Sequence, residues 1–579
     1  MKMSMLRIIL TLVAALLALA GTLLAIWDDG TPATRAQGTI RYVAPDGDDA
    51  RACDSVANRC QTVQHAVDVA ASGDEVRVAQ GDYTGVQGRP ALGGYNGPAV
   101  ITQVLYITKT VTVQGGYSND FDTWNPTAYT TSLNAQNGGR VVFVGGNITV
   151  TLEGLHLTGG DATGLGGATS GGDLGGGISA HDVTLTLSRC QVTTNTAQLG
   201  GGVGLHASNA TLNGNTIQAN TASSGGGIAL DGGNVTLNGN AILSNTANHS
   251  GGGFWQWGSD SALNGNIIQG NVAQSGNGGG LCVHGGNSIT WDNNVIANNQ
   301  AGTDGSGVSL TGGSSTLRHN TIAGQGSGSG VHVDGNAIVG YATATLTDNI
   351  LVGHGVGITV TANNAAILRV TLWGSGTWDN GEDWDGNGTI DHAYDIDGDP
   401  AFVNPAAGEY HIGATSAAVD VGMNAGVTTD VDGESRPMGY GYDLGADEHT
   451  FGYVLTVNGL RVIRGVADSG TLTATLTWRP PTNAVMTYTL SYSTSLITDE
   501  NWDAATVVTD TLPGSTDTYT ATVPYGGDMV YFALKYWNNF GEASRVSPNA
   551  FWPAQHVYLP LVVRNLTSVE SRKVIPVAH

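Results

Sequence analysis

The chain has 579 residues, of which 87 are glycine, 40% are hydrophobic and only 12% are charged. This hydrophobic content is too high for a disordered chain, so the abundance of glycine requires a structural cause. The 47 acidic and 22 basic residues give a formal net charge of −25, which would repel phosphate backbones and therefore argues against nucleic-acid binding.

Residues 1–36 have the pattern of a secretory signal peptide. Lys2 and Arg7 precede an uncharged apolar run over residues 8–27, and a small-residue cleavage site lies near Ala36. We therefore expect an exported protein, either extracellular or on the cell surface. The apolar run is also long enough to span a bilayer, so an uncleaved N-terminal anchor is the alternative, and the membrane would then be contacted only there.

Residues 37–125 are expected to form the start and the N-terminal cap of the main domain. Cys53 and Cys60 lie seven residues apart in the polar segment RACDSVANRC. In an oxidising compartment such a pair forms a disulfide, and two free thiols are the alternative. We predict a Cys53–Cys60 disulfide.

Residues 126–370 contain an internal repeat. Runs of three glycines begin at five positions: Gly175, Gly200, Gly225, Gly251 and Gly278. The period of about 25 residues, with short β-type segments between Gly/Asn turns, predicts a solenoid in which each coil has three strands and three turns.

Each coil also carries one asparagine and, two residues later, one aliphatic residue. The asparagines are Asn215, Asn240, Asn266, Asn294, Asn320 and Asn349, and the aliphatic residues are Ile217, Ile242, Ile268, Ile296, Ile322 and Leu351. If successive coils stack about 4.8 Å apart, these positions form an asparagine ladder beside an inward apolar ladder. Cys190 takes the asparagine position in an earlier coil, so we expect a buried, unreactive thiol there.

These repeats resemble those of right-handed parallel β-helix proteins of the pectate-lyase-like superfold, and the GGG-I and N-T elements are similar to those of polymorphic outer membrane proteins. Residues 42–85 resemble the usual beginning of such helices, in which an amphipathic helix (here residues 63–71) caps the first coils. Residues 398–448 resemble the segment that completes them. The resemblance covers about residues 40–450 and implies the fold. It does not imply one function, because this superfold hosts lyases, hydrolases, adhesins and structural spikes.

The strand that follows each glycine run aligns from coil to coil. In GGGFWQWGSD, strand alternation places Phe254 inward and directs Trp255 and Trp257 outward, about 7 Å apart. The aligned neighbours of this aromatic pair are polar or small, and they include His206, Asp231 and His284. Aromatic faces rimmed by hydrogen-bonding groups suit sugar rings, so these five residues are candidates for glycan binding. Alternatively, the loop over residues 161–174 folds over the tryptophans and buries them.

Catalytic constellations known from this superfold are not evident. A lyase needs clustered carboxylates for calcium with a neighbouring basic residue, and a hydrolase needs an acidic pair. Between residues 175 and 370 the acids do not fall in one column of adjacent coils, and no basic residue lies beside an acidic pair. His206, Asp231 and His284 would be the candidates for acid–base chemistry, but solvated ladder positions account for them better. We predict no catalytic residues.

Residues 371–450 are expected to hold a calcium-loop-like insertion and the completion segment. DWDGNGTID (383–391) is similar to an EF-hand or dockerin loop, with ligands expected from Asp383, Asp385, Asn387, the Thr389 carbonyl and Asp391. Tyr394 stands where such loops carry a bidentate glutamate, and flanking helices are absent from the pattern. A structural Ca²⁺ ion is predicted, and a solvated Asp/Gly turn is the alternative.

Glycine becomes scarcer after residue 450, and alternating apolar and polar residues predict antiparallel strands. Trp478, Tyr492 and Tyr531 give residues 451–550 a resemblance to a fibronectin type III sandwich. Residues 551–579 form a tail of unassigned purpose.

The predicted fold class is all-β: a right-handed single-stranded parallel β-helix followed by an antiparallel β-sandwich. We expect an exported cell-surface or extracellular protein that binds a polysaccharide or surface glycan, or acts in adhesion, without catalysis. A polysaccharide lyase or glycoside hydrolase acting on the β-helix face is one alternative, and a stalk displaying the C-terminal module is another.

Overall fold

A computed structural model describes residues 38–286, 288–438, 441–449, 460–468, 470–478, 487–513, 516–526, 530–537 and 550–552. The predicted signal peptide and nearly all of the predicted tail lie outside these residues. Within them, no helix is long and apolar enough to cross a membrane. The chain divides into two compact units, a solenoid and a C-terminal β-sandwich.

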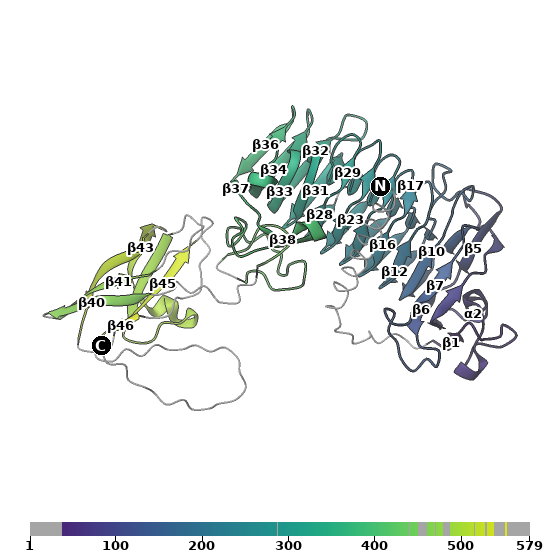
Figure 1. The fold of residues 1–579 in the computed structure, drawn as a ribbon, viewed down its shortest axis with the longest axis horizontal. Coiled ribbons are helices and arrows are strands. Elements are labelled where there is room, and N and C mark those ends of the chain that lie inside the picture. The colour runs from purple at the N-terminus through teal and green to yellow at the C-terminus, as the bar shows by residue number, and fades with distance from the viewer. Residues whose placement is uncertain are drawn as a thin grey trace, which may run out of the picture. The chain divides into compact units, whose positions relative to one another are not determined.

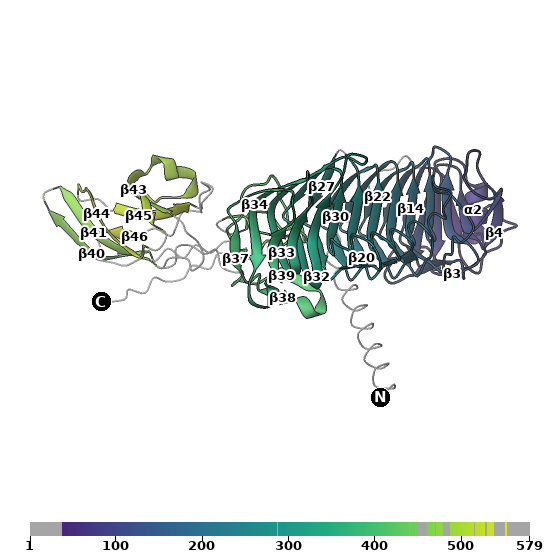
Figure 2. The same ribbon diagram turned by 90° about the horizontal axis from the view of Figure 1, so that it is seen from above.

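The solenoid is built from short parallel strands that stack into three ladders (Figures 1 and 2). The first ladder contains β1 (Ile40–Val43), β2 (Glu75–Ala79), β6 (Val111–Tyr117), β9 (Thr149–Glu153), β12 (Thr184–Ser188), β15 (Asn209–Asn213), β19 (Asn234–Asn238), β23 (Asp260–Asn264), β27 (Ile289–Asp292), β31 (Gly313–Arg318) and parts of β33 (Ala342–Val360) and β34 (Ala365–Gly374), and it ends with β36 (Thr389–Ala393).

The second ladder contains the strands that follow the glycine runs. Its members are β5 (Val100–Ile107), β8 (Arg140–Gly145), β11 (Ile178–His181), β14 (Val203–His206), β18 (Ile228–Asp231), β22 (Phe254–Trp257), β26 (Leu281–His284), β30 (Val308–Thr311), the ends of β32 (Thr321–Asp334) and β33, and β35 (Glu382–Asp385). We call its outward side the tryptophan face.

The third ladder contains the shortest strands. They are β3 (Gly81–Tyr83), β7 (Thr131–Asn134), β10 (Leu155–Thr158), β13 (Gln191–Thr193), β16 (Thr216–Gln218), β20 (Ala241–Leu243), β24 (Ile267–Gln269), β28 (Val295–Ala297), parts of β32, β33 and β34, and β37 (Ile396–Gly398). A further small sheet links the coils through β17 (Thr221–Ala222), β21 (Thr246–Ala247), β25 (Val272–Ala273) and β29 (Gln300–Ala301).

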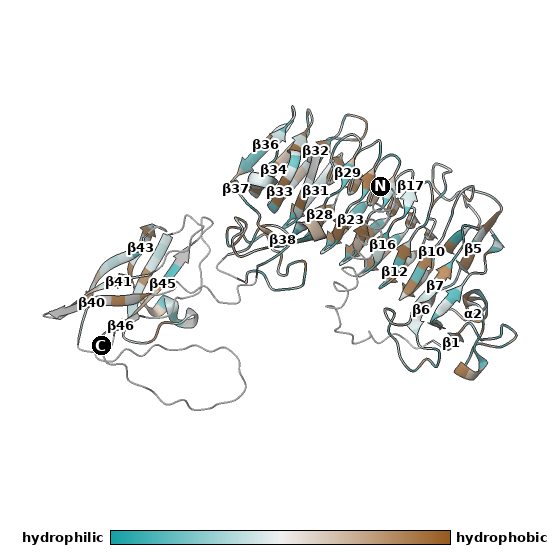
Figure 3. Ribbon diagram, viewed as in Figure 1, coloured by the Kyte–Doolittle hydropathy of each residue, from teal (hydrophilic) through white to brown (hydrophobic). Residues whose placement is uncertain are grey.

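Strand alternation fills the solenoid with aliphatic side chains, and brown hydrophobic segments recur from coil to coil in Figure 3. The predicted inward position of Phe254 is confirmed, since Phe254 and its register partners Val203, Ile228 and Leu281 in successive strands are fully buried. Such a column removes apolar surface from water along the whole solenoid, which is the main stabilising contribution to the fold.

Buried asparagines hold the turns together. The Asn215 backbone N–H and its Nδ2 both donate to Asn240 Oδ1 at 2.9 Å, and Asn215 Nδ2 also donates to the Leu187 carbonyl. This confirms the predicted asparagine ladder. The structure adds a second one, which the sequence reasoning missed: Asn195, Asn220, Asn245, Asn271 and Asn299. In the sequence, four of these asparagines can be recognised because each directly precedes the first residue of β17, β21, β25 or β29.

The N-terminal end is capped as expected. Helix α2 (Val63–Val69) begins at Thr62, whose side chain accepts the His65 N–H, and the helix buries Val63 and Val67 against the first coils. The helix ends two residues earlier than predicted. This region also contains the 3-10 turn η2 (Val56–Asn58) and β4 (Gln87–Pro90), which pairs antiparallel with β5.

The C-terminal end of the solenoid is closed by its last coil. Trp384 on β35 occupies an inward position as the register partner of Ile358, and its ring lies 5.8 Å from that of the buried Trp373. The segment that follows contains η4 (Pro405–Ala407) and the antiparallel pair β38 (Phe402–Asn404) and β39 (Glu409–Ile412), and η3 (Gly376–Trp378) precedes β35.

The C-terminal unit has two antiparallel sheets. One contains β40 (Arg461–Asp468), β41 (Thr471–Thr477) and β44 (Thr518–Pro524), and the other contains β43 (Thr506–Pro513), β42 (Thr487–Ser493), β45 (Val530–Trp537) and β46 (Ala550–Trp552). Leu476, Leu490 and Phe532 are buried between the sheets with Trp478, and η5 (Asp499–Ala504) lies in a connection. The predicted sandwich architecture is therefore present.

Candidate glycan-binding site

Strand β22 presents two tryptophans on the tryptophan face. Phe254 and Gln256 are buried, whereas Trp255 is half-buried and the Trp257 side chain is 52% exposed. Trp257 is the register partner of Asp231 in the preceding coil and of His284 in the following coil. The outward direction and the neighbours of Trp257 predicted from the aligned repeats are thus correct.

The two indole rings pack against each other. Their centroids lie 6.4 Å apart with an interplanar angle of 25°, and the His284 ring lies 6.2 Å from Trp255 and 5.2 Å from Trp257. Because Trp255 is half-buried in this cluster, the site offers one well-exposed aromatic ring, that of Trp257. Both tryptophans were expected to face solvent, and only Trp257 is well exposed.

The loop over residues 161–174 covers the neighbouring coils rather than Trp257. Thr169 donates to Asp231 Oδ2 twice, from its backbone N–H at 2.9 Å and from its hydroxyl at 2.7 Å. The alternative prediction, in which this loop buries the tryptophans, is therefore wrong for Trp257. The loop instead contacts Asp231 and His206 through Thr169.

A buried arginine anchors this loop. Arg140, at the start of β8, is fully buried and donates to the carbonyls of Leu174 (2.9 Å), Gly166 (2.5 Å) and Leu165 (3.5 Å). Asp173 accepts the backbone N–H groups of Gly164 and Gly166 from within the loop. The loop is therefore held at several points, although it belongs to no repeat.

His206 and Asp231 form a hydrogen-bonded pair beside Trp257. His206 Nδ1 lies 3.2 Å from Asp231 Oδ2, and Thr169 Oγ1 lies 3.3 Å from the same nitrogen. The hydrogen bond to His206 lowers the pKa of Asp231 to about 2, and the hydrogen bond to Asp231 raises the pKa of His206. Among the described residues, His206 Nε2 has no hydrogen-bond partner, so a dyad with one free ring nitrogen faces solvent.

Burial lowers the pKa of two further histidines on this face, His284 and His181, and so favours their neutral forms. Burial lowers the pKa of His284, whose Nε2 lies 3.3 Å from Cys282 Sγ. It also lowers the pKa of His181 to about 3, while that ring stacks on Phe143 at 5.1 Å. Burial raises the pKa of the Cys282 thiol to about 12, which leaves it uncharged.

Basic side chains lie on another ladder. The coils between residues 141 and 370 contain Arg189, Arg318 and Arg369 and no lysine. Each lies on or beside a strand of the first ladder, where it pairs with Glu153, Asp292 and Asp391, respectively. A lyase-type arrangement of carboxylates with a nearby base is therefore not formed on the described part of the tryptophan face.

The calcium-loop-like segment is divided between two strands. Asp383 and Asp385 lie on β35, Asn387 lies in the following turn, and Thr389 and Asp391 begin β36. Asp391 is ion-paired with Arg369 at 2.7 Å, and the carboxylates of Asp383, Asp385 and Asp391 are not among the described groups whose atoms lie within 4.8 Å of one another. Calcium binding here stays a prediction from the sequence.

The completion segment contains a tighter set of possible ligand atoms. Atoms of His411, Asp432 and Asp447 lie within 4.8 Å of one another. His411 Nε2 lies 2.7 Å from Asp432 Oδ2, an interaction that raises the pKa of His411 to about 9, while burial raises that of Asp447 to about 6. Asp447 also accepts the Ile412 N–H. The imidazolium therefore serves as the counter-ion of the partly exposed Asp432 and of the buried Asp447. His411 shares no motif with the two carboxylates, so its place beside them was not predicted from the sequence.

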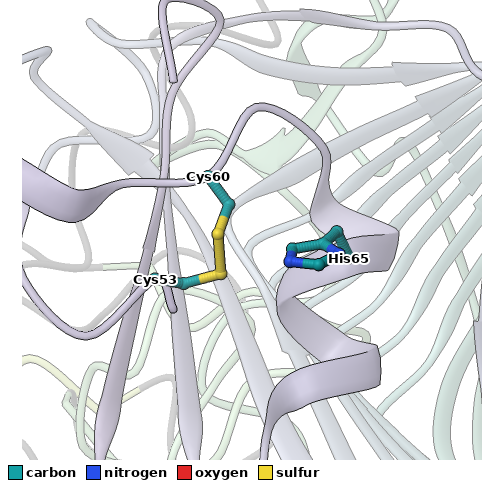
Figure 4. A group of neighbouring side chains, drawn as sticks. All are labelled: Cys53, Cys60 and His65. Atoms are coloured by element: carbon teal, nitrogen blue, oxygen red, sulfur yellow. A yellow bond between two sulfur atoms is a disulfide. The ribbon is translucent and has the colours of Figure 1, made fainter. Parts of the chain in front are cut away.

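Cys53 and Cys60 form a disulfide, with the His65 ring on α2 beside it (Figure 4). Because each sulfur is bonded to the other, neither is free to bind a metal, and the disulfide links Cys53 covalently to Cys60 beside His65. Cys190 is buried as expected, and burial raises the pKa of its thiol to about 12.

Comparison with known proteins supports the fold. The family described as "Right handed beta helix region" matches residues 242–371. The solenoid has a right-handed β-helix fold. The solved structure titled "Crystal structure of pectate lyase Pel9A" is 13% identical to the β-helix protein, with a TM-score of 0.41, and the alignment covers 72% of this chain and 98% of that one. No curated protein matches the chain.

Proposed function

We propose that this β-helix protein is an exported, non-catalytic glycan-binding protein that acts outside the cell or on its surface. The observation that carries the proposal is the exposed Trp257 ring, which the solenoid holds between polar neighbours in adjacent coils. Contiguous apolar patches mark interaction sites, and the Trp257 ring forms such a patch together with the rings of Trp255 and His284. Export is supported by the signal-peptide pattern of residues 1–36 and by the Cys53–Cys60 disulfide.

The geometry favours a sugar as the occupant. A pyranose ring presents C–H groups on its faces and hydroxyls at its edge, so it can stack on Trp257 while its hydroxyls reach Asp231 and His206. Thr169 contacts both Asp231 and His206, so these two side chains are already ordered and lose little conformational freedom when a sugar binds. Flat indole surface combined with fixed polar groups is the usual composition of a small-ligand site.

The proposal is tested by affinity electrophoresis of the full chain in gels containing different polysaccharides, with chain length of each polymer measured after incubation. We expect retention without scission, weakened about tenfold in Trp257→Ala, which corresponds to about 1.4 kcal/mol. Tyr394→Ala is the matched control, because it removes another exposed ring in the last coil. Equal weakening in both variants, or no retention on any polymer, would contradict the proposal and leave the stalk function as the alternative.

Acid–base catalysis is the second candidate, favoured by the His206–Asp231 dyad beside the stacking residue. A histidine whose Nδ1 is oriented by a carboxylate can exchange protons through Nε2. If the chain shortens a polysaccharide, and His206→Ala abolishes shortening while retaining binding, then this candidate replaces the non-catalytic one.

A further inference from the structure

We infer that the Trp257 site selects neutral, hydroxyl-rich glycans and discriminates against uronate polymers. This inference rests on the proposed function and specifies its ligand class. It follows from the distribution of charge around Trp257.

The two outward columns of the tryptophan face contain no lysine or arginine. From β11 to the end of β32, the column that includes Trp257 reads His181, His206, Asp231, Trp257, His284, Thr311 and Asp334. The column that includes Trp255 reads Ser179, Gly204, Ala229, Trp255, Cys282, Ser309 and His332 over the same strands. A uronate carboxylate therefore meets no permanent positive charge on this surface.

The cationic side chains Arg318 and Arg140 have partners elsewhere in the solenoid. Arg318 is paired with Asp292 at 2.6 Å on the first ladder. Arg140 is buried under the loop and donates to its carbonyls. His206 carries a charge only when it is protonated, and that charge is matched by Asp231 at 3.2 Å.

The charged group beside Trp257, the Asp231 carboxylate, is a hydrogen-bond acceptor. Asp231 lies in the coil next to Trp257 and remains ionised at neutral pH, because its hydrogen bonds to His206 and Thr169 stabilise the charged form. An ionised carboxylate accepts hydrogen bonds from sugar hydroxyls and repels a uronate carboxylate at similar distances. Neutral sugars and uronates can both stack on Trp257, so the charge of Asp231 determines which of the two classes binds more tightly.

The test compares the dissociation constants of the full chain for a neutral galactomannan and for polygalacturonate, at pH 7 and low salt, with either calcium or a chelator present. We expect at least tenfold tighter binding of the neutral polymer under both conditions. Asp231→Asn should reduce this ratio at least threefold by strengthening polygalacturonate binding. Asp334→Asn is the matched control, because it removes the same charge from the same column four coils away and should leave the ratio unchanged.

Two results would overturn the inference while leaving glycan binding intact. One is polygalacturonate binding as tight as galactomannan binding and weakened by Trp257→Ala. The other is a ratio that changes equally in Asp231→Asn and Asp334→Asn, since selectivity would then reflect total charge and not this site. If Trp257→Ala alters binding of neither polymer, the proposed function itself fails.

Discussion

At the scale of single residues, position in the coil decides what an asparagine or an aromatic side chain does. Asn240 is buried and makes ladder hydrogen bonds on both sides, whereas Asn264, only one coil further on, is exposed at the end of β23. Trp291 is fully buried on β27, whereas Trp257 faces solvent on β22. The same residue types therefore stabilise the core or remain available to a ligand, depending on strand alternation.

The asparagine ladder gives a direct prediction for stability. Asn240→Ala removes the acceptor of the Asn215 backbone N–H and of one Asn215 Nδ2 hydrogen, and it removes the Nδ2 donor to the Leu212 carbonyl, so we expect the free energy of unfolding to fall by about 2–4 kcal/mol in urea titrations. Asn264→Ala should change it by less than about 0.5 kcal/mol, because that side chain is exposed. Similar losses in both variants would show that the ladder does not contribute specifically.

The His206–Asp231 pair predicts a pH dependence. The pKa of His206 is raised above its usual 6.5, so its contribution to stability is complete below 6.5 and is lost as the pH rises through the raised value. The pKa of Asp231 is lowered from 3.8 to about 2, so its contribution is lost as the pH falls from about 4 towards 2. The His206–Asp231 pair therefore stabilises the folded protein most between about pH 4 and pH 6.5.

An NMR titration of the His206 ring checks the predicted rise of its pKa. We expect a pKa above 6.5 in the wild type and a decrease in Asp231→Asn, which loses the charge that stabilises the imidazolium. His206→Gln identifies the resonance. An unchanged pKa in Asp231→Asn would refute the assigned interaction.

At the scale of elements, the loop over residues 161–174 depends on Arg140. Arg140→Met removes three hydrogen bonds to loop carbonyls, so hydrogen exchange over residues 161–174 should accelerate at least tenfold while exchange in β14 and β18 is preserved. Arg189→Met, which removes an exposed arginine with a single 3.5 Å ion pair, should leave the loop unchanged. Unaltered exchange in Arg140→Met would mean that other contacts hold the loop.

Elements that belong to the repeat could be predicted from the sequence, and those outside it could not. The spacing of the glycine runs and of Asn215 and Asn240 determined the register, so the neighbours of Trp257 were correctly placed. The loop carries no periodic signal, so its docking on Asp231 was not foreseen. The place of His411 beside Asp432 and Asp447 depends on the turns of the completion segment, which carry no periodic signal. Calcium binding by residues 383–391 stays a prediction, with Asp383 and Asp391 on strands of different ladders.

At the scale of the whole molecule, the solenoid is a linear array in which each coil contacts mainly its neighbours. Deleting residues 221–245 joins Asn220 to Thr246 at equivalent ladder positions and removes one complete coil. We expect a folded protein with a β-type circular dichroism spectrum and cooperative melting. Deleting only residues 221–233 should prevent folding, because the remaining half-coil cannot continue the three ladders. An unfolded product from the full-coil deletion would show that the coils are not interchangeable units.

The solenoid therefore acts as a rigid frame that fixes Trp257 and Asp231 one coil apart, at the strand spacing of a parallel sheet. The most direct measurement of the central claim is a crystal structure of the full chain with a neutral oligosaccharide. We predict an intact sugar whose ring stacks on Trp257 and whose hydroxyls hydrogen-bond to Asp231. A sugar bound elsewhere with Trp257 unoccupied, or a cleaved product beside His206, would contradict it.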